Sequence, residues 1–93
     1  MGRTLEMPSE ETLFCLSPPW IQEYGVLPVE LDGGSLHVVA KRKVTPNELE
    51  ILSQDSKKNI IINEVVDEAI FREAYYRFYG SIFPREMLEK YEP

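Results

Sequence analysis

The sequence predicts a small α/β (α+β) domain: a three-stranded mixed sheet with a β-hairpin and helices packed on it, in the order α-α-β-β-α-β-α. The Asp-Gly-Gly turn at residues 32–34 lies between two apolar stretches and indicates the hairpin. A helix start at residues 45–49, followed by the β-branched run at 60–62, indicates a strand–helix–strand unit. An apolar stripe over residues 63–79 predicts a long closing helix.

The N-terminal part predicts a leader and two short helices. Residues 1–8 are polar and are expected to form a loose leader. Ser9 caps the first helix and is followed by two glutamates, which the helix dipole favours. The proline pair at residues 18–19 ends this helix and starts a second one, Trp20–Tyr24. Gly25 terminates it, because glycine accepts a left-handed backbone.

The hairpin strands are expected at residues 26–31 and 35–41. Pro28 lacks an N–H group, which places the first strand at an edge of the sheet. His37 alternates with the apolar side chains of the second strand and is expected to be exposed. The residues of that strand expected to point inward are Leu36, Val38 and Ala40.

The next helix has the clearest local signal. Thr45 is expected to cap it, Pro46 to take its first position, and Glu48 to complete a capping box. This helix is expected to run to about Lys58. Ile60-Ile61-Ile62 then forms a short β-branched run, typical of a strand covered on both faces.

A long helix, capped by Asn63 and ending at Gly80, closes the predicted domain, which spans residues 9–80. Residues 81–93 are expected to form a tail with a short helix starting at Pro84. One apolar stripe of the long helix consists of Val66, Ile70, Ala74 and Phe78. A second line, on an adjacent face, consists of Phe71, Tyr75 and Tyr79.

The composition argues against several functions. A net charge of −6 and a pI of about 4.7 argue against a nucleic-acid partner. With one histidine, His37, and one cysteine, Cys15, the sequence offers no ordinary metal cluster, no Cys/His pair and no catalytic constellation. We therefore expect no catalytic residue, no metal and no cofactor. There is no apolar run of 18 residues, so direct insertion into a membrane is not expected.

Two sets of residues remain as candidate binding sites. The aromatic line Phe71, Tyr75 and Tyr79 reads as core or as a partner-binding face, because tyrosine is favoured at interfaces. We predict that this line is exposed and that it contacts a partner together with Trp20. The basic run Lys41-Arg42-Lys43 reads as a solvated turn or, in the alternative, as an anion site.

Several short motifs resemble the N-terminal domain of the bacterial type II secretion and type IV pilus assembly ATPases (the general secretory pathway protein E family). Residues 24–29 (YGVLPV) and 36–40 (LHVVA) resemble the family's "gvlPl" segment and the strand after it. Residues 45–49 (TPNEL) are similar to its "d-P-x-n" helix start, with threonine in place of the usual acidic residue. The stretch from Asp67 to Gly80 resembles its closing helix, which ends in "Y-g".

The resemblance implies a non-catalytic adaptor that docks a cytoplasmic motor onto the cytoplasmic part of an inner-membrane platform protein. It places the chain in the cytoplasm, peripheral to the inner membrane through that partner. No Walker motif is present, so the ATPase activity of the family would belong to an attached motor domain. The resemblance implies that any oligomer would form through that motor domain.

Some relatives instead bind cyclic-di-GMP through duplicated Arg-Leu-Gly-like elements, which makes nucleotide binding the alternative function. Arg3-Thr4-Leu5 is not such an element and nothing repeats it. A nucleotide would then be expected near Lys41, Arg42 and Lys43.

Overall fold

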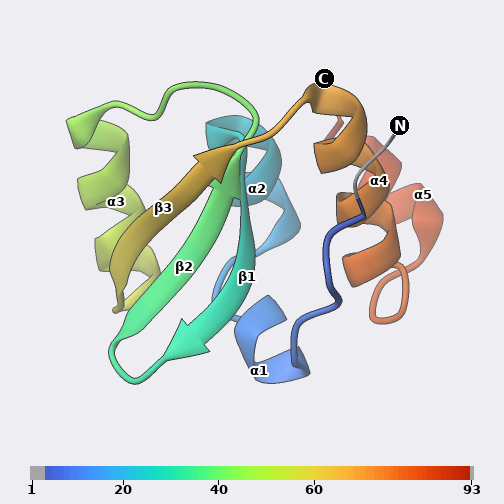
Figure 1. Cartoon of the computed structure of the whole chain (residues 1–93). Helices are drawn as coiled ribbons and strands as arrows, with labels where there is room; N and C mark the ends of the chain where they lie inside the picture. Colours follow the sequence, from blue (N-terminus) through green and yellow to red (C-terminus); the bar gives the residue numbers. More distant parts are fainter. Residues whose placement is uncertain (1–3, 93) are drawn as a thin grey trace.

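The computed structural model describes residues 4–92, so residues 1–3 of the predicted leader, Arg3 among them, and Pro93 lie outside the description. The predicted order of elements and the three-stranded mixed sheet are confirmed (Figure 1). The elements are α1 (Glu10–Leu13), α2 (Pro18–Tyr24), β1 (Val26–Asp32), β2 (Ser35–Ala40), α3 (Pro46–Ser56), β3 (Asn59–Val65), α4 (Glu68–Tyr79) and α5 (Arg85–Lys90).

The sheet has the order β1-β2-β3, with β2 in the centre. β1 and β2 pair antiparallel through the predicted hairpin, and β2 and β3 pair parallel, so that α3 is the crossover between them. Pro28 lies on an edge strand, as its missing N–H group predicts. The register shifts between Pro28 and Glu30, which places a bulge at Val29 and brings Glu30 opposite His37.

Local sequence signals account for two of the element boundaries. Gly25 ends α2 in the left-handed conformation, with φ of 66°. The capping box of α3 is complete: the Glu48 N–H donates to Thr45 Oγ1 at 3.2 Å, and the Thr45 N–H donates to Glu48 Oε1 at 3.0 Å. These signals act over three or four residues, which is why the sequence alone predicts them.

Two expectations about the third strand are wrong. Ile60, Ile61 and Ile62 are half-buried instead of covered on both faces, because β3 is an edge strand. Asn63 does not cap a helix, since parallel pairing with β2 continues past it to Val65. The helix begins later, at Glu68.

The leader and the tail both contribute to the core. In Figure 1 the leader runs between β1 and α4. Leu5 is buried there, and Arg77 Nη2 donates to its carbonyl oxygen at 2.5 Å. In α5, Leu88 is fully buried. Leu5 of the leader and Leu88 of the tail are therefore part of the same core as the rest of the domain. No helix within residues 4–92 is long and apolar enough to span a membrane.

Candidate functional site

The predicted aromatic line is not exposed. Phe71 and Tyr79 are 1% exposed and Tyr75 is 0% exposed, so the expectation that this line forms a surface strip is wrong. At about 100° per residue, positions 71, 74, 75, 78 and 79 share one helix face about 140° wide, and α4 buries all five. Ala74 and Phe78 of the first predicted stripe thus share one apolar face with the second line, whereas Val66 precedes α4 and Ile70 is half-buried.

This face is covered by elements outside the sheet. The Tyr75 hydroxyl donates to the Leu88 carbonyl of α5 at 2.9 Å. The Tyr79 hydroxyl donates to the carbonyl of Leu13, the last residue of α1, at 2.7 Å and to that of Leu16 at 3.2 Å. Both hydroxyls therefore have buried partners, and these tyrosines hold the fold together instead of facing a partner.

Trp20 has a different position from the other predicted contacts. It lies in α2, half-buried, and its ring stacks on Tyr24 with centroids 5.3 Å apart and planes 10° from parallel. Part of the indole remains accessible to a partner. Trp20 is the only residue of the predicted contact set that keeps this property.

The basic run is largely engaged within the domain. Arg42 Nη2 lies 3.3 Å from Glu48 Oε2 and donates to the Glu23 carbonyl at 2.9 Å. Lys41 Nζ lies 3.9 Å from Glu68 Oε1 and 5.3 Å from the centre of the Phe71 ring. Two of the three cations thus have carboxylate partners already. The structure does not assemble the run into an anion site.

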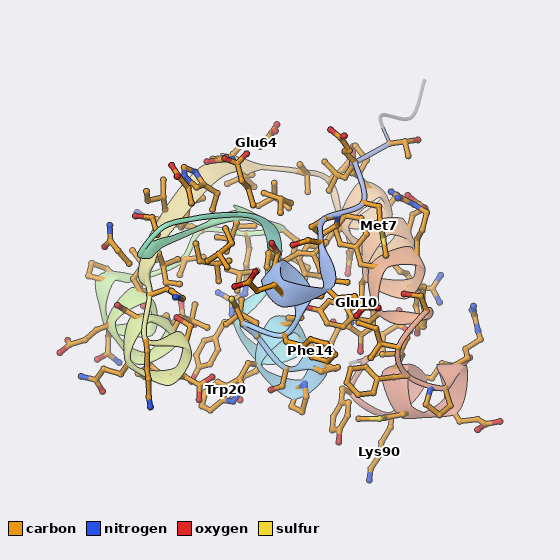
Figure 2. The ribbon with its side chains drawn as sticks, turned by 90° about the horizontal axis from the view of Figure 1, so that it is seen from below. Met7, Glu10, Phe14, Trp20, Glu64 and Lys90 are labelled. Carbon is orange, nitrogen blue, oxygen red and sulfur yellow. The ribbon has the colours of Figure 1, made fainter. Side chains whose placement is uncertain are left out.

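Three large hydrophobic side chains are exposed among residues 4–92: Met7 (43%), Phe14 (61%) and Val65 (60%). Phe14 is the C-cap residue of α1, and Met7 precedes that helix in the leader. Figure 2 looks onto α1 from below and shows both side chains, with Trp20 farther along on α2. We call Met7, Phe14 and Trp20 the α1 surface.

The backbone on either side of Phe14 is hydrogen-bonded to the core. Leu13 and Leu16, on either side of Phe14 and Cys15, are 0% and 1% exposed. Tyr79 bonds both of their carbonyls, and the Ser9 side chain caps the helix by accepting from the Thr12 N–H at 3.3 Å. The backbone around Phe14 is therefore fixed while its ring faces solvent.

Sequence analysis missed the exposure of Phe14. Phe14 stands between the apolar residues Leu13 and Leu16 in the sequence, so it does not stand out by composition. A spacing of three residues would place Leu13 and Leu16 on one face of a helix, whereas Phe14 would be turned about 100° from Leu13. That spacing is the signal that could have found it.

The rim of the α1 surface is acidic. Glu10 and Glu11 are exposed in the first turn of α1, and Figure 2 shows Glu10 in the same view as Met7 and Phe14. The adjacent Cys15 is half-buried, and its thiol donates to the Glu11 carbonyl at 3.4 Å. Burial and the Glu11 charge raise the pKa of the Cys15 thiol, which disfavours the reactive thiolate.

One group of side chains in residues 4–92 has a composition that could ligate a cation. Donor atoms of Glu30, Asp32 and His37 lie within 4.8 Å of one another at the hairpin, and His37 Nδ1 is 2.9 Å from Asn63 Oδ1. The bulge in β1 creates this proximity, which sequence analysis did not anticipate. The two carboxylates are exposed, and such clusters are common on surfaces without an ion, so we assign the cluster no metal.

A groove of about 630 Å³ lies along α4 and α5. Tyr76 is its aromatic centre, with the guanidinium carbons of Arg85 and Arg72 at 4.5 and 5.4 Å from the ring centroid. Burial and a hydrogen bond to Glu92 raise the pKa of Tyr76 to about 12. Its arginines, Arg72, Arg77 and Arg85, pair with Glu92, Glu73 and Glu89 respectively. Because each of these arginines is paired with a carboxylate, the groove has little net positive charge with which to bind an anion.

Comparison with known proteins adds no assignment. No protein-family model matches the sequence, and no curated protein matches it significantly.

Proposed function

We propose that this chain is a non-catalytic protein-docking domain and that the α1 surface is its contact with the partner. The observation that carries the proposal is Phe14: an aromatic ring 61% exposed on a backbone that Tyr79 holds from beneath. Aromatic anchors on rigid backbone bind with little loss of conformational entropy. Met7 and the accessible part of Trp20 extend the apolar contact.

The chemistry of the surface defines the kind of partner. A protein that covers Phe14 needs an apolar pocket, and the exposed carboxylates of Glu10 and Glu11 favour lysine or arginine at the rim of that pocket. The motif resemblance to the secretion and pilus ATPases supplies a candidate: the cytoplasmic domain of an inner-membrane platform protein. The domain would then couple a cytoplasmic motor to the membrane through this contact.

The test is a binding titration of the purified platform cytoplasmic domain against three forms of the chain: wild type, Phe14→Ala and Val65→Ala. Val65 is a matched control, because it is exposed to 60% but lies on β3. We expect Phe14→Ala to weaken binding at least about tenfold, as for an interface hot spot. Val65→Ala should bind like the wild type.

Equal binding by the wild type and Phe14→Ala would contradict the proposed surface. Binding of cyclic-di-GMP, lost on Arg42→Ala, would instead support the alternative function. The structure gives that alternative no specific support, because Arg42 is engaged with Glu48 and the Glu23 carbonyl.

A further inference from the structure

The two edges of the sheet are protected differently. On β1, Pro28 and the bulge at Val29 interrupt the edge, as natural proteins commonly arrange. The β3 strand has a bulge at Asn63, but its stretch from Asn59 to Ile62 pairs regularly with β2, and the strand contains neither a proline nor a glycine. Figure 1 shows β3 as the outermost strand, and within residues 4–92 no further strand pairs with it. The β3 edge is therefore the one that a strand could extend.

The direction of the backbone groups follows from the pairing with β2. The Asn59 N–H donates to the Gly34 carbonyl at 2.9 Å, so residue 59 turns its backbone inward. In a parallel ladder, alternate residues direct their N–H and C=O groups to the same neighbour. Ile60 and Ile62 consequently direct theirs to the outer side, where an added strand would bond to them.

The sequence of this edge reads the same in both directions. Residues 59–63 are Asn-Ile-Ile-Ile-Asn. If two such edges pair antiparallel about Ile61, Ile60 lies opposite Ile62 of the other copy, and Asn59 lies opposite its Asn63. Ile61 then faces Ile61.

This register also fits the hydrogen-bonding phase. In an antiparallel pair, residues that exchange both backbone bonds must each direct their groups outward. Ile60 and Ile62 meet that condition and would be opposite one another. A register shifted by one residue would instead pair an outward residue with an inward one. Sequence symmetry and backbone phase thus select the same alignment.

We propose that the outer edge of β3 pairs antiparallel with the same edge of a second copy of this chain, about a two-fold axis at Ile61, to form a six-stranded sheet. The contact is short. The Lys58 carbonyl already accepts from Ser53 Oγ at 2.7 Å, and the bulge at Asn63 ends the regular ladder. Pairing is therefore weak and reversible.

A disulfide at the axis provides the test. We would replace Cys15 with serine and introduce Ile61→Cys, then oxidise the protein at micromolar concentration. In the proposed register, Ile61 forms a non-hydrogen-bonded pair with Cα atoms about 4.5 Å apart, within disulfide reach. The matched control is Asn59→Cys in the same background. It lies on the same edge, but its two copies would be four residues out of register, about 13 Å apart. We expect most of the Ile61→Cys chain to cross-link and the Asn59→Cys chain to remain monomeric.

Sedimentation equilibrium of the unmodified chain tests the contact without a cross-link. The wild type should reach twice the 10.8 kDa monomer mass as its concentration rises, whereas Ile61→Lys should stay monomeric because it places like charges opposite each other. Phe14→Lys should dimerise like the wild type, since the α1 surface is a separate site. Equal cross-linking of the two cysteine variants, or a wild type that is monomeric at millimolar concentration, would overturn the proposal.

Discussion

The Tyr79 hydroxyl bonds the backbone on either side of Phe14, and it can be removed without other change to the ring. In Tyr79→Phe, the carbonyls of Leu13 and Leu16 lose a donor that lies at 2.7 and 3.2 Å in the wild type. Tyr79 is 1% exposed, so water does not replace that donor readily. Leaving a buried acceptor unsatisfied costs about 1–3 kcal/mol. We expect the free energy of unfolding, measured by urea denaturation, to fall by that amount.

Tyr24→Phe is the matched control. It makes the same chemical change at a half-buried tyrosine whose hydroxyl has no hydrogen bond within residues 4–92. The control should unfold within about 0.5 kcal/mol of the wild type, as surface changes usually do. Amide hydrogen exchange at Leu13 and Leu16 should be faster in Tyr79→Phe and unchanged in Tyr24→Phe, because only the Tyr79 hydroxyl bonds the carbonyls of these two residues.

Alkaline pH gives a second measurement of the same bond. Burial raises the pKa of Tyr79 far above its usual value. A tyrosine of the unfolded chain ionises near pH 10, so the contribution of the neutral hydroxyl is complete below about pH 10 and declines as the pH rises beyond it. Tyr79→Phe should lose less stability over that range than the wild type. Equal urea midpoints for Tyr79→Phe and Tyr24→Phe, together with equal losses of stability above about pH 10, would refute the proposed role of the Tyr79 hydroxyl.

Four alanine substitutions, one of them a control, test the fold by urea denaturation. Gly25→Ala should lower the free energy of unfolding by about 1–2 kcal/mol, because φ is +66° there. The control is Gly34→Ala, whose added methyl group would point into open space and should change stability by less than about 0.5 kcal/mol. Equal effects of the two substitutions would contradict this prediction. Thr45→Ala should cost about 0.5–2 kcal/mol by removing the cap. The hydrogen bond from the Thr45 N–H lowers the pKa of Glu48. Wild-type stability should therefore decline as the pH falls from about 4.3 through that lowered pKa. If a variant without the Glu48 carboxylate lost stability in acid as the wild type does, this prediction would be wrong. Leu88→Ala should cost about 2–5 kcal/mol because the side chain is fully buried; a loss below 1 kcal/mol would show that α5 is not part of the core.

The elements that sequence analysis predicted correctly depend on local interactions. The turn at residues 32–34, the capping box at Thr45 and the end of α2 at Gly25 are each determined within four residues. Edge placement of β1 was also predictable, since a missing N–H group at Pro28 is a property of the residue itself.

The errors concern burial by distant segments. Tyr79 is covered by residues 63 and 66 positions earlier, and Tyr75 by one 13 positions later. Nothing in the periodicity of α4 reveals those partners. Likewise, the exposure of Ile60–Ile62 depends on which strand is central, which the sequence leaves open. The predicted exposure of Phe71, Tyr75 and Tyr79 was wrong for this reason, and the exposed phenylalanine is instead Phe14.

We propose that this domain docks a protein through the α1 surface, and a backbone amide chemical-shift titration of the isotope-labelled chain with the platform cytoplasmic domain tests this. We expect shifts that cluster at Met7, Phe14 and Trp20 and that vanish in Phe14→Ala. Shifts confined to residues 41–43 on addition of cyclic-di-GMP, with none from the platform domain, would contradict it.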